Sequence, residues 1–156
     1  MKSFKKEFWL LTLIIMLVIM VQLWGSQKAL DVRLYYSALE AQDFFASLSL
    51  SEVNAYLRHE LFDLVFIFAY SYLLLLQIRR VYKPGLITTA FALTPGFFDL
   101  LETSTILGVL IGWVQSPSWL GAITFMKWLA STLVLLAILF GWVRKQFIGL
   151  KTAKKF

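Results

Sequence analysis

Four long runs of apolar residues, separated by short polar or basic stretches, dominate the pattern of this chain. They cover approximately residues 8–24, 61–78, 86–114 and 119–143. A helix needs about 20 mostly apolar residues to cross the hydrocarbon core of a bilayer. The pattern therefore predicts an all-α integral membrane protein, built as a four-helix transmembrane bundle.

The connections between these runs also contain patterns that predict short helices, helix caps and turns. Apolar positions recur at helical spacing within residues 26–60, which predicts one or two short amphipathic helices at the membrane interface or across the end of the bundle. Ser49, followed three residues later by Glu52, predicts a capping box at the start of the second long helix. A basic turn ending in Pro84-Gly85 precedes the third run, and a short polar turn at residues 115–118 precedes the fourth.

Composition places the chain in the membrane class. Hydrophobic residues make up 60% of the chain and charged residues 15%, with a mean hydropathy of +0.75; soluble domains have about 45–50% apolar and about 25% charged residues. The absence of Cys and the single His exclude disulfides, thiolate metal sites and multi-histidine metal sites within one chain, so we expect no cofactor. The first run is long for a signal peptide and lacks a good cleavage site, which favours a retained span. No internal repeat is evident, so residues 1–156 are interpreted as a single membrane domain.

The distribution of positive charge predicts the topology. Eleven Lys and Arg residues lie in the N-terminal stretch, the turn at residues 79–83 and the basic tail at residues 144–156, against three within residues 26–60 and none within residues 115–118. The positive-inside rule then places both termini in the cytoplasm and residues 26–60 outside. We expect a multi-pass protein of the plasma membrane or bacterial inner membrane, with membrane lipids as partners. The net charge of +6 reflects this topology, so nucleic-acid binding is not expected.

The main chemical signal is a set of charges at membrane depth. Asp99 and Glu102 are three residues apart and share one face of the third predicted helix. A charge at this depth costs roughly 3 kcal/mol on insertion scales. The turn at residues 115–118 makes the third and fourth helices antiparallel neighbours, and Lys127 then lies deep enough to pair with Glu102 or Asp99. Because two acids outnumber one lysine, one carboxyl is expected to be protonated or to have further hydrogen-bond donors.

Further polar residues surround this predicted ion pair. Asp99, Glu102 and Lys127 are the candidate catalytic residues. The candidate ligand-binding residues are polar or aromatic side chains on the second and fourth helices, from the outer mouth inward: Arg58, His59, Asp63, Tyr70, Thr124 and Trp128. Ser131 lies four residues after Lys127, on the same face. Gly108 and Gly112 have the spacing of small residues at helix contacts, which predicts a possible homo-oligomer face.

Three functions fit these features. The first is binding or transport of a small solute, ion or lipid at the carboxylate–lysine site, which we rank ahead because no catalytic signature is complete. The second is an intramembrane enzyme acting on a lipid or isoprenoid, with Asp99 and Glu102 dividing acid and base roles. The third is an accessory or structural subunit, in which the ion pair only fixes helix register. Nucleotide-binding loops, nucleophile elbows and metalloprotease motifs are absent, and whether the protein is an enzyme stays open.

Overall fold

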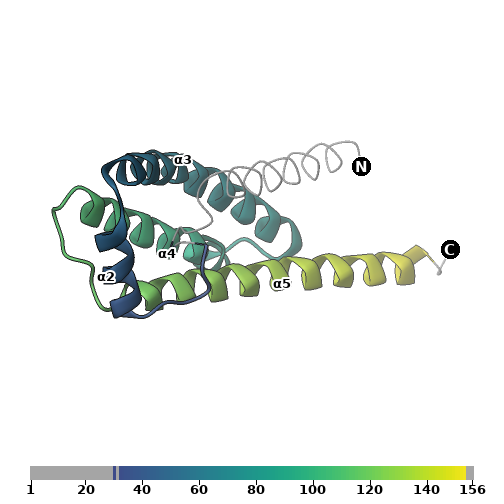
Figure 1. Ribbon diagram of the computed structural model, residues 1–156. Helices are drawn as coiled ribbons and strands as arrows, with labels where there is room; N and C mark the ends of the chain where they lie inside the picture. The colour runs from purple at the N-terminus through teal and green to yellow at the C-terminus, as the bar shows by residue number, and fades with distance from the viewer. Residues whose placement is uncertain (1–29, 31, 154–156) are drawn as a thin grey trace.

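The described part of the chain consists of α-helices joined by short connections, with no strand (Figure 1). A computed structural model describes residue 30 and residues 32–153. The helices are α2 (Ala38–Ser47), α3 (Leu50–Val81), α4 (Leu86–Leu110) and α5 (Leu120–Ala153). The all-α prediction is confirmed for these residues. The first predicted span, residues 8–24, lies outside them.

Capping boxes begin both α2 and α3. The Ser49 side chain accepts a hydrogen bond from the Glu52 backbone N–H, and the Ser49 backbone N–H donates to the Glu52 carboxylate at 2.8 Å, as the sequence predicts. Ser37 and Glu40 form the same arrangement at α2, where the Ser37 N–H donates to the carboxylate at 2.6 Å. α2 is thus one short helix between the first predicted span and α3, and it runs across one end of the longer helices (Figure 1).

α4 ends at Leu110, four residues before the predicted end of the third span. Gly112 has a φ of 75°, the left-handed conformation that glycine adopts without steric cost. The Gly112 N–H donates to the Val109 carbonyl at 3.0 Å and the Trp113 N–H donates to the Gly108 carbonyl at 2.9 Å, which is the Schellman pattern of a helix end. Gly112 therefore lies beyond the helix and does not share a helical face with Gly108, and a homo-oligomer contact stays a prediction.

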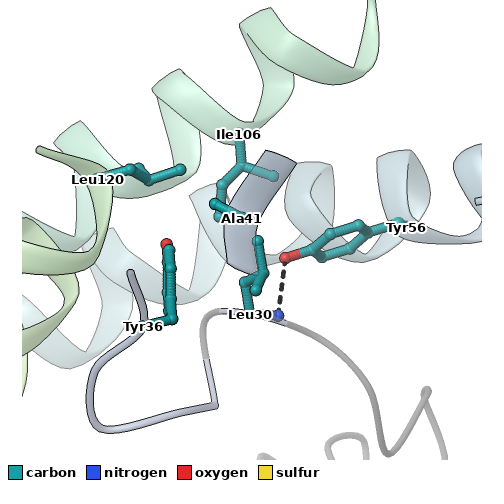
Figure 2. Packing of buried hydrophobic residues seen from close by; sticks show 6 residues of the cluster. All are labelled: Leu30, Tyr36, Ala41, Tyr56, Ile106 and Leu120. Atoms are coloured by element: carbon teal, nitrogen blue, oxygen red, sulfur yellow. Dashed lines mark hydrogen bonds between the residues drawn. The ribbon is translucent and has the colours of Figure 1, made fainter. Parts of the chain in front are cut away.

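α4 is the middle helix of the packing. It contacts both α3 and α5, and α3 also contacts α5. One apolar cluster lies at the α2 end of the bundle and contains Leu30, Tyr36, Ala41, Tyr56, Ile106 and Leu120 (Figure 2). A second cluster lies further along the helices and contains Leu74, Ile78, Ala92 and Val134. Because Ala92 and Ile106 belong to different clusters, the acidic residues of α4 lie between two apolar layers.

Two of the described helices are long and apolar enough to cross a membrane. These are α3 and the Leu120–Phe147 part of α5, and the buried share of their most apolar windows is only 28% and 22%. The core helix of a soluble protein is mostly buried, whereas most residues of these two stretches are not buried. α4, which carries Asp99 and Glu102, is not among the candidate spans.

Candidate functional site

A buried ion cluster joins α4 and α5. Asp99, Glu102 and Lys127 expose 8%, 0% and 7% of their surface. The Lys127 Nζ lies 3.1 Å from Asp99 Oδ1 and 2.5 Å from Glu102 Oε2. The lysine thus contacts both acids, where depth and spacing alone had left the choice between them open.

The other carboxylate oxygens of this cluster also have donors. The Tyr70 hydroxyl, on α3, donates to Asp99 Oδ2 at 2.8 Å. The Thr124 hydroxyl, on α5 one turn before Lys127, donates to Glu102 Oε1. Each of the four oxygens therefore has a polar partner, and the cluster connects three helices. Buried polar groups need such partners, because an unpaired one loses its hydration without compensation.

The formal charges of the cluster do not balance. One ammonium faces two carboxylates, which leaves a net charge of −1 when all three groups are ionised. A net charge in a poorly solvated interior is costly. Uptake of one proton or one monovalent cation would neutralise the cluster.

Tyr36 extends this network toward α2 and was not among the residues predicted from sequence. Its side chain is 2% exposed, and its hydroxyl lies 3.0 Å from the Thr124 hydroxyl. The two residues are 88 positions apart, so no local pattern links them. The apolar spacing around residue 36 indicates a buried position, and the polar contact becomes visible only in the folded chain.

Trp128 lies beside the cluster at the same end of α5. Its indole Nε1 donates to the Arg33 carbonyl at 2.9 Å, and the Lys127 Nζ lies 5.5 Å from the centre of its ring. That distance is within the range of a cation–π interaction. Trp128 thus ties the connection before α2 to α5 and helps to surround the ammonium group.

Three other predicted residues lie nearer the start of α3. Arg58 is exposed, and its Nε donates to the Asn54 carbonyl of its own helix at 3.2 Å. The ring of His59 packs 6.3 Å from that of Tyr56. Asp63 lies seven residues before Tyr70 on α3, about two turns away.

Ser131 bonds within its own helix. Its hydroxyl donates to the Lys127 carbonyl at 2.8 Å, as Ser and Thr commonly do in helices.

The site consists of carboxylates, an ammonium and hydroxyls. No group of three or more His, Cys, Asp or Glu side chains within the described ranges is arranged to hold a metal ion. The polar contacts of Tyr36, Thr124, Glu102, Lys127, Asp99 and Tyr70 form one connected network, which runs from the α2 end of the bundle to Asp99. Comparison with protein-family models, curated proteins and solved structures found no match to this chain.

Proposed function

We propose that the chain is a multi-pass membrane protein in which α3, α4 and α5 cross the bilayer together with a first span at residues 8–24. The outward faces of α3 and α5 support this proposal, because they carry large apolar side chains that water would not solvate well. More than half of the surface is exposed for each of these residues: Phe62, Val65, Phe68, Leu135, Leu136, Leu139 and Phe140. α4 crosses in contact with both neighbours, which cover its acidic residues.

The proposed topology has the C-terminus in the cytoplasm and α2 outside. Basic residues lie at the end of α3 (Arg79), in the turn after it (Lys83) and on α5 (Arg144 and Lys145), and Lys145 Nζ donates to the Arg80 carbonyl. Basic residues from two distant segments thus meet at the end of the bundle away from α2. The positive-inside rule favours a cytoplasmic position for that end.

Within this membrane protein we propose that Asp99, Glu102 and Lys127 bind a small cation, in the course of binding or transporting a small solute or ion. The observation that carries this proposal is a single buried ammonium shared by two buried carboxylates. Ionisable groups at membrane depth commonly mark ion and proton pathways. The excess negative charge gives the site a reason to take up a proton or a monovalent cation.

Flux measurements in proteoliposomes test this function. Purified protein is reconstituted with a pH-sensitive dye inside the vesicles, and a proton or potassium gradient is applied. We expect wild-type protein to dissipate the gradient and Glu102→Gln to lose this activity, because the amide cannot take up a proton or balance a cation. Asp43→Asn is the matched control, since Asp43 is an exposed acid on α2 and is not part of the ion cluster. Equal flux in wild type and Glu102→Gln would refute the proposed role.

A purely structural role is the second candidate, and one observation favours it. All four carboxylate oxygens of the cluster have polar partners, as expected of a polar tie that fixes helix register. This candidate predicts no flux in the wild type, together with a loss of stability in Glu102→Gln. The same two proteins therefore distinguish the two roles.

A further inference from the structure

The connection that contains α2 reaches directly to the buried cluster through Tyr36. We call residues 32–47 the end cap. The Tyr36 side chain is buried among Leu30, Ile106 and Leu120 at this end of the bundle (Figure 2). Its hydroxyl is 3.0 Å from the Thr124 hydroxyl, which itself contacts Glu102. The Thr124 hydroxyl is thus the one group between the Tyr36 hydroxyl of the end cap and the Glu102 carboxylate of the site.

The Thr124 hydroxyl joins Tyr36 to Glu102. It is oriented to donate to Tyr36 Oη, to Glu102 Oε1 and to the Leu120 carbonyl, the last at 3.2 Å. A hydroxyl has only one proton to donate, so these three acceptors share it. Tyr36 therefore contacts the same hydroxyl that holds Glu102 Oε1, and its own hydroxyl provides one of the hydrogen bonds that seat the end cap on α5.

The backbone of the end cap is also seated closely against α5. A Cβ built at Gly121 would overlap the Tyr36 carbonyl oxygen, so only glycine permits this approach. Two further hydrogen bonds hold the chain just before Tyr36: Trp128 Nε1 donates to the Arg33 carbonyl at 2.9 Å, and the Leu30 N–H donates to the Tyr56 hydroxyl at 3.3 Å (Figure 2). The start of the cap is thus attached to α5 through Arg33, the residue before it in the structure is attached to α3, and the close approach at Tyr36 depends on one small residue.

We propose that the end cap closes the buried site, with Tyr36 as the positioning residue that couples the seating of the cap to Glu102. This inference rests on the proposed function of the cluster. When the cap is seated, Glu102 is covered and held by Thr124; when Tyr36 is displaced from α5, Glu102 becomes accessible from the α2 end. The cap is therefore the control point for entry of the cation on the outer side.

Carboxyl labelling in lipid nanodiscs tests this coupling without relying on flux. The protein is treated with a water-soluble carbodiimide and glycine ethyl ester, and labelling of Glu102 and Asp99 is measured by peptide mass spectrometry. Any Lys127–Glu102 amide formed by the activated carboxyl is counted as labelled Glu102. Gly121→Ala places a methyl group against the Tyr36 carbonyl, while Gly85→Ala is the matched control, because a Cβ there meets only Thr88 Oγ1 at 3.8 Å.

Tyr36→Phe provides a second variant that leaves the backbone and the ring in place. Its matched control is Tyr35→Phe, because the Tyr35 side chain is 62% exposed. We expect Tyr36→Phe to raise Glu102 labelling about fivefold, which corresponds to roughly 1 kcal/mol for one hydrogen bond. Gly121→Ala should raise it at least as much, whereas both controls should label at the wild-type rate.

Two outcomes would overturn the role of the cap. Unchanged Glu102 labelling in both Tyr36→Phe and Gly121→Ala would mean that the cap does not cover the site. An equal rise at Glu102 and Asp99 would mean that the whole bundle has loosened, because Asp99 lies about one turn away on α4 and receives its own hydrogen bond from Tyr70. The proposed function fails separately, through normal flux in Glu102→Gln.

Discussion

Removal of the Lys127 ammonium is the most direct test of the ion cluster. Lys127→Met keeps a flexible side chain of similar length but leaves the carboxylates of Asp99 and Glu102 facing each other without the cation that lies 3.1 and 2.5 Å from them. At an effective dielectric constant of about 20, these contacts contribute a gross attraction of roughly 5 to 7 kcal/mol each, and much of it only offsets the cost of burying the charges. What matters for stability is the uncompensated negative charge that remains.

The expected loss is about 3 kcal/mol in the free energy of unfolding. Breaking a buried ion pair from one side usually costs about 3–5 kcal/mol. We expect the lower end of this range, because polar groups in helices unfolded within a micelle still find other partners. Denaturant unfolding in mixed micelles, followed by circular dichroism, measures the change. Lys83→Met is the matched control, since Lys83 is exposed and should change stability by less than about 0.5 kcal/mol.

A double-mutant cycle separates the ion pair from other effects of the substitution. Adding Glu102→Gln to Lys127→Met removes one of the unpaired charges, so the double variant should recover about 1–2 kcal/mol relative to the sum of the single changes. A loss below about 1 kcal/mol for Lys127→Met would refute the reasoning, because it is typical of an exposed ion pair. Strict additivity in the cycle would equally show that Lys127 and Glu102 do not interact.

Three further perturbations test other parts of the structure. Tyr70→Phe removes a donor to the cluster and should lower the free energy of unfolding by about 1–2 kcal/mol, whereas exposed Tyr72→Phe should not change it. Hydrogen bonds from the Ser37 backbone and side chain lower the pKa of Glu40. The Ser37–Glu40 capping box therefore stabilises α2 at neutral pH, and this stabilisation is lost as the pH falls through the lowered pKa. Amide hydrogen exchange, corrected for its intrinsic rate, should show α2 opening in acid before α3. Gly141→Ala would place a Cβ 2.7 Å from Cβ of Val81, the last residue of α3. It should lower the free energy of unfolding by about 1–3 kcal/mol by forcing α3 and α5 apart, and the same unfolding assay measures this change.

Local chemistry explains which parts of the fold were predictable. The start of α3 follows from the Ser49 capping box, a pattern that works within four residues. The contact between α4 and Lys127 follows from a short turn, which makes two helices antiparallel neighbours. Which residues face each other across the two helices then depends only on how far each residue lies from the turn. The end of α4 was predicted too late, because hydrophobicity continues past the point where Gly112 takes a positive φ.

The non-local contacts could not be predicted in the same way. Tyr36 reaches Thr124 across 88 residues, and its position depends on how the end cap folds over α5. Arg58 has a charge and a depth that suit the mouth of a site, but its guanidinium turns back to the Asn54 carbonyl. Depth and charge indicate which residues can reach a site, whereas the packing of the connecting segment decides which ones do.

The position of α4 links stability and function in this protein. Among the long described helices, α4 is the one that is not a candidate span, and its two acids lie between apolar layers that include Ala92 and Ile106. Its neighbours supply what it lacks, since α3 and α5 bring the hydroxyls and the ammonium that satisfy both carboxylates. Any substitution of Asp99 or Glu102 therefore changes helix packing and the proposed cation site together. Tyr36→Phe differs, because it removes one hydroxyl and leaves both the buried ring and every charge of the cluster in place. It is therefore the substitution that separates control of the site from the stability of the bundle.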